Sequence, residues 1–306
     1  MDRYCFIFPG QGSQYVGMGK DLYDSFNRAK ELYEHAEDIL KINIKKLSFE
    51  GPAEDLQKTL FTQPAILVHS IVCFEILQGK GVSPQLACGH SLGEYSTLYS
   101  AGVLSFESVL KLVKKRGELM FQEGEKKPGA MAAVIGLSDE IVIDLCKNVK
   151  GVVVPANYNA PGQVVISGEP NAVKLVCDMA SAKGALKTIM LAVSGAFHSP
   201  LLQESAENFK EYLKSFEFNP PKFPIIPNRT GIATDNTDEI RSALEEQLIN
   251  PVLWTKSILS AKNLGFTTFV EVGPGRVLSG LVKRIDKSLK TINAGCVEDI
   301  NSFKVA

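Results

Sequence analysis

The spacing of apolar residues, which changes character in the middle of the chain, constrains the fold more than any other feature. Up to about residue 122, short apolar runs typical of buried strands alternate with longer segments that have the period of a helix. The expected strands are residues 4–8 and 85–88, and the expected helices are residues 25–39, 62–77, 94–101 and 106–121. Pro64 fits the first turn of the second helix. This alternation predicts a parallel sheet with helices between its strands.

The next stretch of the chain has shorter units. Strands are expected at residues 131–135, 152–155, 163–167 and 187–191, and helices at residues 138–146 and 171–183. This βαββαβ order is that of a ferredoxin-like unit. Longer units then resume, with helices expected at residues 201–216, 237–248 and 276–285 and a strand at residues 267–272.

A small domain therefore interrupts a larger one. The polar, charged segment 123–129 contains Gly and Pro and is typical of an exposed crossing between domains. We expect residues 1–125 and 195–306 to form one discontinuous α/β domain, and residues 126–194 to form an inserted ferredoxin-like domain.

Charge and composition exclude several classes of protein. With 33 basic and 34 acidic residues the formal net charge is −1, which gives no reason to expect a nucleic acid partner. The longest apolar region, residues 65–77, is interrupted by His69 and Glu75 and is too short to cross a bilayer. The N-terminal apolar run is too short and wrongly flanked for a secretion signal. The six cysteines form no C-x-x-C pair. We expect a cytoplasmic protein with reduced thiols and no membrane partner.

Residues 89–93 read Gly-His-Ser-Leu-Gly and lie between an expected strand and an expected helix. In a nucleophile elbow, glycines let the strand and helix approach closely, while the serine hydroxyl is exposed at a sharp turn beside backbone N–H groups. Two glycines and a serine also occur in ordinary tight turns, so the flanking elements carry the argument. They favour Ser91 as a nucleophile.

A nucleophilic serine needs a base, and the chain has four histidines. His35 lies in a charged helix, where a solvated side chain is the simplest interpretation. His69 lies in an apolar helix, as a hydrogen-bonded core histidine does. His90 adjoins Ser91, and neighbouring side chains diverge at such a turn. His198, in a loop of small residues, is the best base, and its pairing with the elbow is what favours it.

Glycine-rich stretches and metal-ligand patterns give no sign of a cofactor. Residues 10–15 place Tyr where a dinucleotide fingerprint needs its last glycine, and residues 273–275 also lack a phosphate-binding lysine. No cluster of His, Cys or carboxylate residues has metal-ligand spacing. We expect neither a metal nor another bound cofactor.

Four motifs together resemble those of the malonyl-CoA:acyl carrier protein transacylases in order and spacing. They are Pro-Gly-Gln-Gly-Ser-Gln at 9–14, Gly-His-Ser-Leu-Gly-Glu at 89–94, Gly-Ala-Phe-His-Ser at 195–199 and Glu-Val-Gly-Pro-Gly at 271–275. The resemblance implies a hydrolase-like α/β core with a ferredoxin-like insertion. It also implies transfer of malonyl from malonyl-CoA to the phosphopantetheine thiol of holo acyl carrier protein through a malonyl-serine. A free-standing chain of this kind favours fatty-acid synthesis.

The resemblance also implies roles for matched residues. Ser91 is acylated, His198 is the base, and the backbone N–H groups of Gln11 and Leu92 form the oxyanion hole. Arg116 holds the free malonyl carboxylate. The other matched positions are Gln63, Asn157, Asn159 and Gln247. The first three line the family's site, although each is equally a buried amide that satisfies nearby backbone. At Gln247, the backbone carbonyl orients the histidine in place of an acid, and the side chain is expected to be irrelevant to that role.

Alternatives to malonyl transfer remain open at this point. A serine hydrolase would use the same serine, histidine and oxyanion hole, and a carrier-docking module would need no turnover. Arg116 argues against most hydrolases, but it follows Lys114 and Lys115, and such a basic run is commonly a solvated helical face. Its spacing from Leu112 and Val113 lets it face inward.

A docking surface for an acidic carrier is a further hypothesis. Lys283, Lys287 and Lys290 recur with helical spacing, and Arg284 lies among them. A solvated helical face explains these residues equally well.

Overall fold

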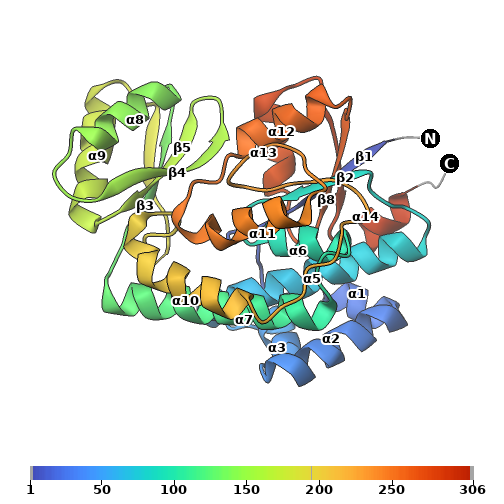
Figure 1. Ribbon diagram of the computed structural model, residues 1–306. Helices are drawn as coiled ribbons and strands as arrows, with labels where there is room; N and C mark the ends of the chain where they lie inside the picture. Colours follow the sequence, from blue (N-terminus) through green and yellow to red (C-terminus); the bar gives the residue numbers. More distant parts are fainter. Residues whose placement is uncertain (1–2, 194, 304–306) are drawn as a thin grey trace.

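Two sheets, one parallel and one antiparallel, organise the computed structural model, which describes residues 3–193 and 195–303 (Figure 1). The five-stranded sheet has the order β7-β2-β1-β8-β9, and every neighbouring pair in it is parallel. Its strands are β1 (Tyr4–Phe8), β2 (Leu86–Gly89), β7 (Ile225–Ile226), β8 (Thr268–Val272) and β9 (Lys290–Ala294). The predicted parallel sheet is confirmed.

Helices cover both faces of the parallel sheet. Alternate residues of β1 enter different cores: Phe6 and Phe8 pack with α2, α5 and α7, whereas Cys5 and Ile7 pack with α12 and α13. Burial on both faces explains why this strand is continuously apolar. The helices of this part of the chain are α1 (Lys20–Ser25), α2 (Asn27–Leu40), α3 (Ile44–Phe49), α4 (Ala53–Leu56), α5 (Thr59–Gly79), α6 (Gly93–Ser100), α7 (Phe106–Lys126), α10 (Gln203–Leu213), α11 (Thr237–Glu245), α12 (Trp254–Asn263), α13 (Val277–Ile285) and α14 (Val297–Ser302), with short 3-10 turns at η1 (Pro200–Leu202) and η2 (Gln247–Ile249).

The antiparallel sheet has the order β4-β5-β3-β6 and carries two helices on its outer face (Figure 1). Its elements are β3 (Ala130–Ile135), α8 (Asp139–Lys147), β4 (Val153–Ala160), β5 (Gln163–Gly168), α9 (Pro170–Ala182) and β6 (Lys187–Met190). The βαββαβ order is the one predicted. Ala132 and Val134 of β3 pack under the helices, whereas Met131 and Ala133 enter the main core. This alternation brings Met131 to the wall of the cavity described below.

We propose that this unit is an inserted domain of residues 126–194. Ser194, its expected last residue, lies outside the described residues. The expected crossing at 123–129 is wrong in part, because α7 continues to Lys126. Glu123 is 4% exposed and accepts a hydrogen bond from Ser205 of α10, so the segment is buried at its start, whereas residues 125–128 are exposed.

The helix that contains Pro64 is longer than predicted. It begins at Thr59, because the N–H groups of Phe61 and Thr62 both bond to the carbonyl of Lys58. Pro64 therefore lies in the second turn, where its missing N–H costs one backbone hydrogen bond. With 21 residues, α5 meets the length and composition of a membrane-spanning helix, but 83% of its most apolar stretch is buried inside the protein. We interpret it as the central core helix.

Four elements of the C-terminal half lack a counterpart in the prediction: β7, β9, α12 and α14. The strand β9 also overturns the helical reading of the basic residues near it. The helix α13 ends at Ile285, and Lys290 begins β9, so Lys283, Lys287 and Lys290 do not share a helical face. Asp286 accepts the backbone N–H of Ser288 and turns the chain into the strand.

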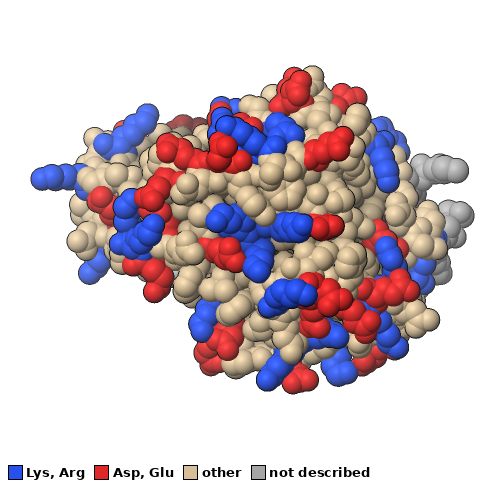
Figure 2. All heavy atoms as spheres, turned by 60° about the horizontal axis from the view of Figure 1, so that its bottom comes forward, with Lys and Arg blue, Asp and Glu red and all other residues tan. Residues whose placement is uncertain are grey.

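Charged side chains of both signs alternate on the face shown in Figure 2. Along helices of the chain, Lys111 pairs with Glu107 at 2.5 Å and Lys20 pairs with Asp24 at 2.7 Å. A surface of this kind carries no broad field of one sign on that face, in keeping with the net charge of −1.

Candidate active site

Ser91 lies at a sharp turn between β2 and α6. Its φ of 51° lies in the left-handed region that residues other than glycine rarely adopt. A Cβ on Gly89 would lie 2.0 Å from the carbonyl of Gly93, and a Cβ on Gly93 would lie 2.0 Å from the carbonyl oxygen of Phe8. Both glycines are therefore required by the close approach of β2, α6 and β1, which is the geometry of a nucleophile elbow.

Asn228, which the sequence analysis missed, holds this elbow from outside. Its Oδ1 accepts a hydrogen bond from the backbone N–H of Ser91 at 2.7 Å, and its Nδ2 donates to the carbonyl of Gly89 at 2.6 Å. Asn228 follows β7, a strand of two residues that is too short to leave a periodic signal. Asn228 lies beyond the carboxyl end of a parallel strand, where functional residues of such sheets gather. That position is known only once the order of the strands in the sheet is known.

His198 is the histidine that meets the serine. Its Nε2 lies 2.7 Å from Ser91 Oγ, and its Nδ1 lies 2.9 Å from the carbonyl oxygen of Gln247 and 3.1 Å from that of Asn250. Because carbonyl oxygens only accept, Nδ1 carries the hydrogen and Nε2 accepts from the serine. Burial, and then the charge of Arg116, lower the pKa of His198 to about 3. The imidazole is therefore neutral at neutral pH.

The other three histidines lie elsewhere or bond to other partners. His35 is exposed and packs against the ring of Phe106. His69 is fully buried, with Nε2 at 2.9 Å from the carbonyl oxygen of Gly295. His90 directs Nε2 to Asn159 Oδ1 at 2.7 Å instead of to the serine.

Arg116 faces inward, as its helical spacing allows. The residue is 1% exposed, and its terminal nitrogens donate to Gln63 Oε1 at 2.8 Å, to Ser91 Oγ at 3.1 Å and to Gln247 Oε1 at 3.1 Å. None of these partners is charged, and no ion pair of Arg116 occurs among residues 3–193 and 195–303. Burial lowers the pKa of the guanidinium, although arginine stays charged at neutral pH. A buried cation without a carboxylate partner is a place for an anion.

The side chain of Gln247 makes hydrogen bonds of its own, apart from the contact of its backbone carbonyl with His198. Besides accepting from Arg116, it donates from Nε2 to the carbonyl of Ser91 at 3.0 Å and to Glu94 Oε2 at 2.7 Å. Glu94 also accepts the backbone N–H of Asn228 at 3.2 Å. Burial raises the pKa of Glu94 to about 7, and the hydrogen bonds from Gln247 and Asn228 oppose that rise.

Within the described part of the chain, the side chains of the three amides that the resemblance assigned to the site form no hydrogen bond to nearby backbone. Gln63 bonds to Arg116 and, at 3.3 Å, to the sulfur of Met120. Asn159 bonds to His90, and Asn157 lies in the wall of the cavity that contains Ser91.

A cavity of about 100 Å³ joins these groups. Its lining includes Gln11, His90, Ser91, Leu92, Arg116, Met120, Met131, Asn157, Leu191, Val193, Phe197 and His198. The backbone N–H groups of Gln11 and Leu92 have no hydrogen-bond partner in the described part of the chain. Two unpaired donors beside a serine hydroxyl can stabilise an oxyanion formed there.

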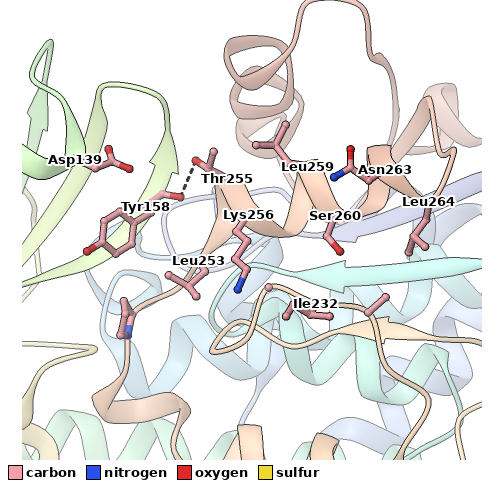
Figure 3. Close-up of a pocket in the computed structure, with 13 residues that line it drawn as sticks. Asp139, Tyr158, Ile232, Leu253, Thr255, Lys256, Leu259, Ser260, Asn263 and Leu264 are labelled. Carbon is pink, nitrogen blue, oxygen red and sulfur yellow. Dashed lines mark hydrogen bonds between the residues drawn. The ribbon is translucent and has the colours of Figure 1, made fainter.

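A larger cavity, of about 760 Å³, is lined in part by the segment 251–264, which follows Asn250 in the chain (Figure 3). Leu253, Leu259 and Tyr158 line it, and Thr255 Oγ1 bonds to the carbonyl of Tyr158 at 3.1 Å. Ser91 and His198 are not among its lining residues. Size therefore does not identify the reactive site in this fold, whereas the convergence of polar groups does.

Comparison with known proteins agrees with this geometry. Residues 5–306 match the model of the acyl transferase domain family. A malonyl CoA-acyl carrier protein transacylase of Bacillus subtilis is 43% identical over 303 residues, which are 98% of this chain and 96% of that protein. The chain belongs to the malonyl-CoA:acyl carrier protein transacylase family. A transacylase of the same name from Staphylococcus aureus is 39% identical over 306 residues and 99% of both chains.

Solved transacylases share the whole fold. One, a malonyl-transacylase in complex with a type II PKS acyl-carrier protein, has a TM-score of 0.95 at 39% identity and covers 98% of both chains. A malonyl CoA-acyl carrier protein transacylase from Clostridium perfringens has a TM-score of 0.93 at 38% identity, covering 98% of this chain and 95% of that one. The α/β core with its antiparallel insertion is therefore the transacylase fold. Among the described residues of this chain, no group of three or more His, Cys, Asp or Glu side chains is placed to hold a metal ion.

Proposed function

We propose that this chain moves malonyl from malonyl-CoA to the phosphopantetheine thiol of holo acyl carrier protein, with Ser91 as the acylated residue. The observation that carries the proposal is the buried guanidinium of Arg116, which lies 3.1 Å from Ser91 Oγ and lacks a carboxylate partner among the described residues. A carboxylate that binds there holds the neighbouring thioester carbonyl over the serine. The same site offers nothing comparable to a neutral acyl group.

Acylation begins when His198 Nε2 accepts the proton of Ser91 Oγ and the oxygen attacks the thioester carbon. The N–H groups of Gln11 and Leu92 donate to the oxyanion of the tetrahedral intermediate. The intermediate collapses, the carbon–sulfur bond breaks, and the coenzyme A thiolate takes the proton from His198. A malonyl ester of Ser91 remains. The carrier thiol then gives its proton to His198 and its sulfur attacks the ester carbon. The bond from that carbon to Ser91 Oγ breaks, His198 returns the proton to Ser91 Oγ, and malonyl leaves as a thioester of the carrier.

Binding of malonyl also strengthens the base. The positive charge of Arg116 is the second cause of the low pKa of His198. A substrate carboxylate offsets that charge, so the pKa of His198 rises toward the operating pH, where a general base is most effective. Nδ1 of His198 donates to the carbonyls of Gln247 and Asn250. These two acceptors stabilise the imidazolium that forms when Nε2 takes the proton. No acidic residue is needed for that step.

The remaining assignments are proposals that rest on the matched motifs and the contacts described above. Gln63, Asn157 and Asn159 support the substrate site, and the Gln247 carbonyl orients His198. We further propose that the protein acts in the cytoplasm and supplies malonyl units to fatty-acid synthesis; the names of its relatives as malonyl CoA-acyl carrier protein transacylases support the transfer from coenzyme A to the carrier.

Intact-mass measurement after mixing with malonyl-CoA tests the proposal. The wild-type chain should gain one malonyl group and lose it when holo acyl carrier protein is added, and Ser91→Ala should gain none. Stoichiometric acylation of Ser91→Ala would show that another residue carries the acyl group. Release of malonate to water instead of transfer to the carrier would indicate a hydrolase.

A further inference from the structure

Glu94 places a carboxylate directly behind the reactive residues, in the first turn of α6. It is 1% exposed and is not part of the cavity lining. Only its Oε2 is used, by Gln247 Nε2 at 2.7 Å and the backbone N–H of Asn228 at 3.2 Å, while Oε1 has no hydrogen-bond partner in the described chain. Burying a carboxylate in this way costs free energy, and the mechanism above does not use it.

The contact with Gln247 decides which way that amide points. A primary amide has two donors at one end and an acceptor at the other. Because Glu94 Oε2 and the Ser91 carbonyl both accept, the NH₂ group of Gln247 faces them and its Oε1 faces Arg116. Turned by half a rotation, the amide would present donors to a guanidinium, which has no acceptor.

We infer that Glu94 is a positioning residue for malonyl recognition: it fixes the orientation of the Gln247 amide, and the amide oxygen then holds the Arg116 guanidinium beside Ser91. This inference rests on the proposed function. The amide also separates the two side chains, since Glu94 and Arg116 form no direct ion pair in the described residues. The guanidinium is thereby held by neutral acceptors and keeps its charge for the substrate carboxylate.

The test is the ratio of kcat/KM for malonyl-CoA to kcat/KM for acetyl-CoA, measured on the same enzyme preparation. This ratio does not depend on the fraction of active enzyme. Glu94→Met has a similar volume but no acceptor oxygen, and its ratio should fall about tenfold or more, the value of a hydrogen bond to a charged group. The loss should come mainly from a higher KM for malonyl-CoA. Glu94→Gln retains an acceptor oxygen and should restore most of the ratio.

Asn228 makes this ratio more informative than either rate alone. Loss of Glu94 also unpairs the Asn228 N–H, and since Asn228 holds the elbow, we expect this effect to slow both substrates equally. Only the hydrogen bonds from Glu94 through Gln247 to Arg116 should affect malonyl transfer and acetyl transfer differently. In a Gln247→Met background, Glu94→Met should therefore change the ratio less than twofold.

Glu123 provides the matched control. It is also a buried carboxylate, 4% exposed, and it accepts from Ser205 Oγ at 3.2 Å, away from the reactive residues. Glu123→Met should leave the ratio unchanged even if it lowers the melting temperature. Glu94→Asp, which keeps the charge but shortens its reach, is the second variant if Glu94→Met folds poorly, and its ratio should also fall.

Arg116→Ala separates failure of this inference from failure of the proposed function. If Arg116→Ala lowers the ratio while Glu94→Met and Glu94→Asp leave it unchanged, the inference is wrong and the proposed function stands. An additive effect of Glu94→Met in the Gln247→Met background also overturns it. If Arg116→Ala itself leaves the ratio unchanged, malonyl recognition by Arg116 is wrong as well.

Discussion

Replacing Arg116 with alanine tests the feature that distinguishes a malonyl transferase from other serine acyltransferases. The guanidinium is 1% exposed and lies 3.1 Å from Ser91 Oγ, so a substrate carboxylate would meet it with little water between them. Truncating one partner of a buried, hydrogen-bonded charge pair costs about 2 to 4 kcal/mol. We expect kcat/KM for malonyl-CoA to fall about 30- to 1,000-fold, which is the same energy expressed as a rate ratio.

Acetyl transfer should respond differently to the same substitution. Acetyl has no carboxylate to lose, and removal of the Arg116 charge lets the pKa of His198 rise from about 3, which makes it a better base. We therefore expect kcat/KM for acetyl-CoA to fall little or to increase. Arg116→Lys should recover only part of the malonyl activity, because an ammonium cannot form two parallel hydrogen bonds to a carboxylate.

The assay measures kcat/KM for both thioesters on the wild type, Arg116→Ala and Arg116→Lys, with holo acyl carrier protein as acceptor. Lys115→Ala is the matched control, since it removes the adjacent positive charge from the same helix but lies outside the lining of the reactive cavity. It should change either rate less than about twofold, as surface substitutions do. A parallel loss on both substrates in Arg116→Ala would mean that Arg116 supports the fold and does not read the carboxylate.

Two further predictions concern histidines. His198→Ala should lose transfer by about 10² to 10⁴ fold, the usual contribution of a positioned general base, in a steady-state assay; near-normal turnover would direct attention to His90. Burial lowers the pKa of His69 to about 4, so this residue stays neutral in the folded state and takes up a proton on unfolding. The free energy of unfolding should therefore decrease as the pH falls below 6.5, the pKa of this residue in the unfolded state. The decrease should be about 2 kcal/mol between pH 7 and pH 5. In urea unfolding, His69→Gln should reduce the difference in unfolding free energy between these pH values by that amount, and an unchanged difference would contradict the assignment.

The sequence alone determined the local features of this protein. Apolar runs located β1, β2 and the strands of the inserted unit, because burial on one or both faces of a sheet leaves a periodic record in neighbouring residues. The elbow was also predicted from neighbouring residues. Gly89 and Gly93 lie within two residues of Ser91, and both are needed where three backbones approach one another closely. The spacing of Arg116 along one helix allowed it to face inward, and it is buried.

Only the tertiary structure decided which distant groups meet at the serine. Asn228 reaches the Ser91 amide across 137 positions of the chain, and Gln247 reaches Glu94 across 153. These contacts depend on the order of the parallel strands and on how α6, α7 and η2 pack, and a single buried Asn, Gln or Glu leaves no periodic pattern in its neighbours. The direction of the Gln247 amide could not be predicted either, because a hydrogen-bond network fixes it and that network exists only after the elements have packed.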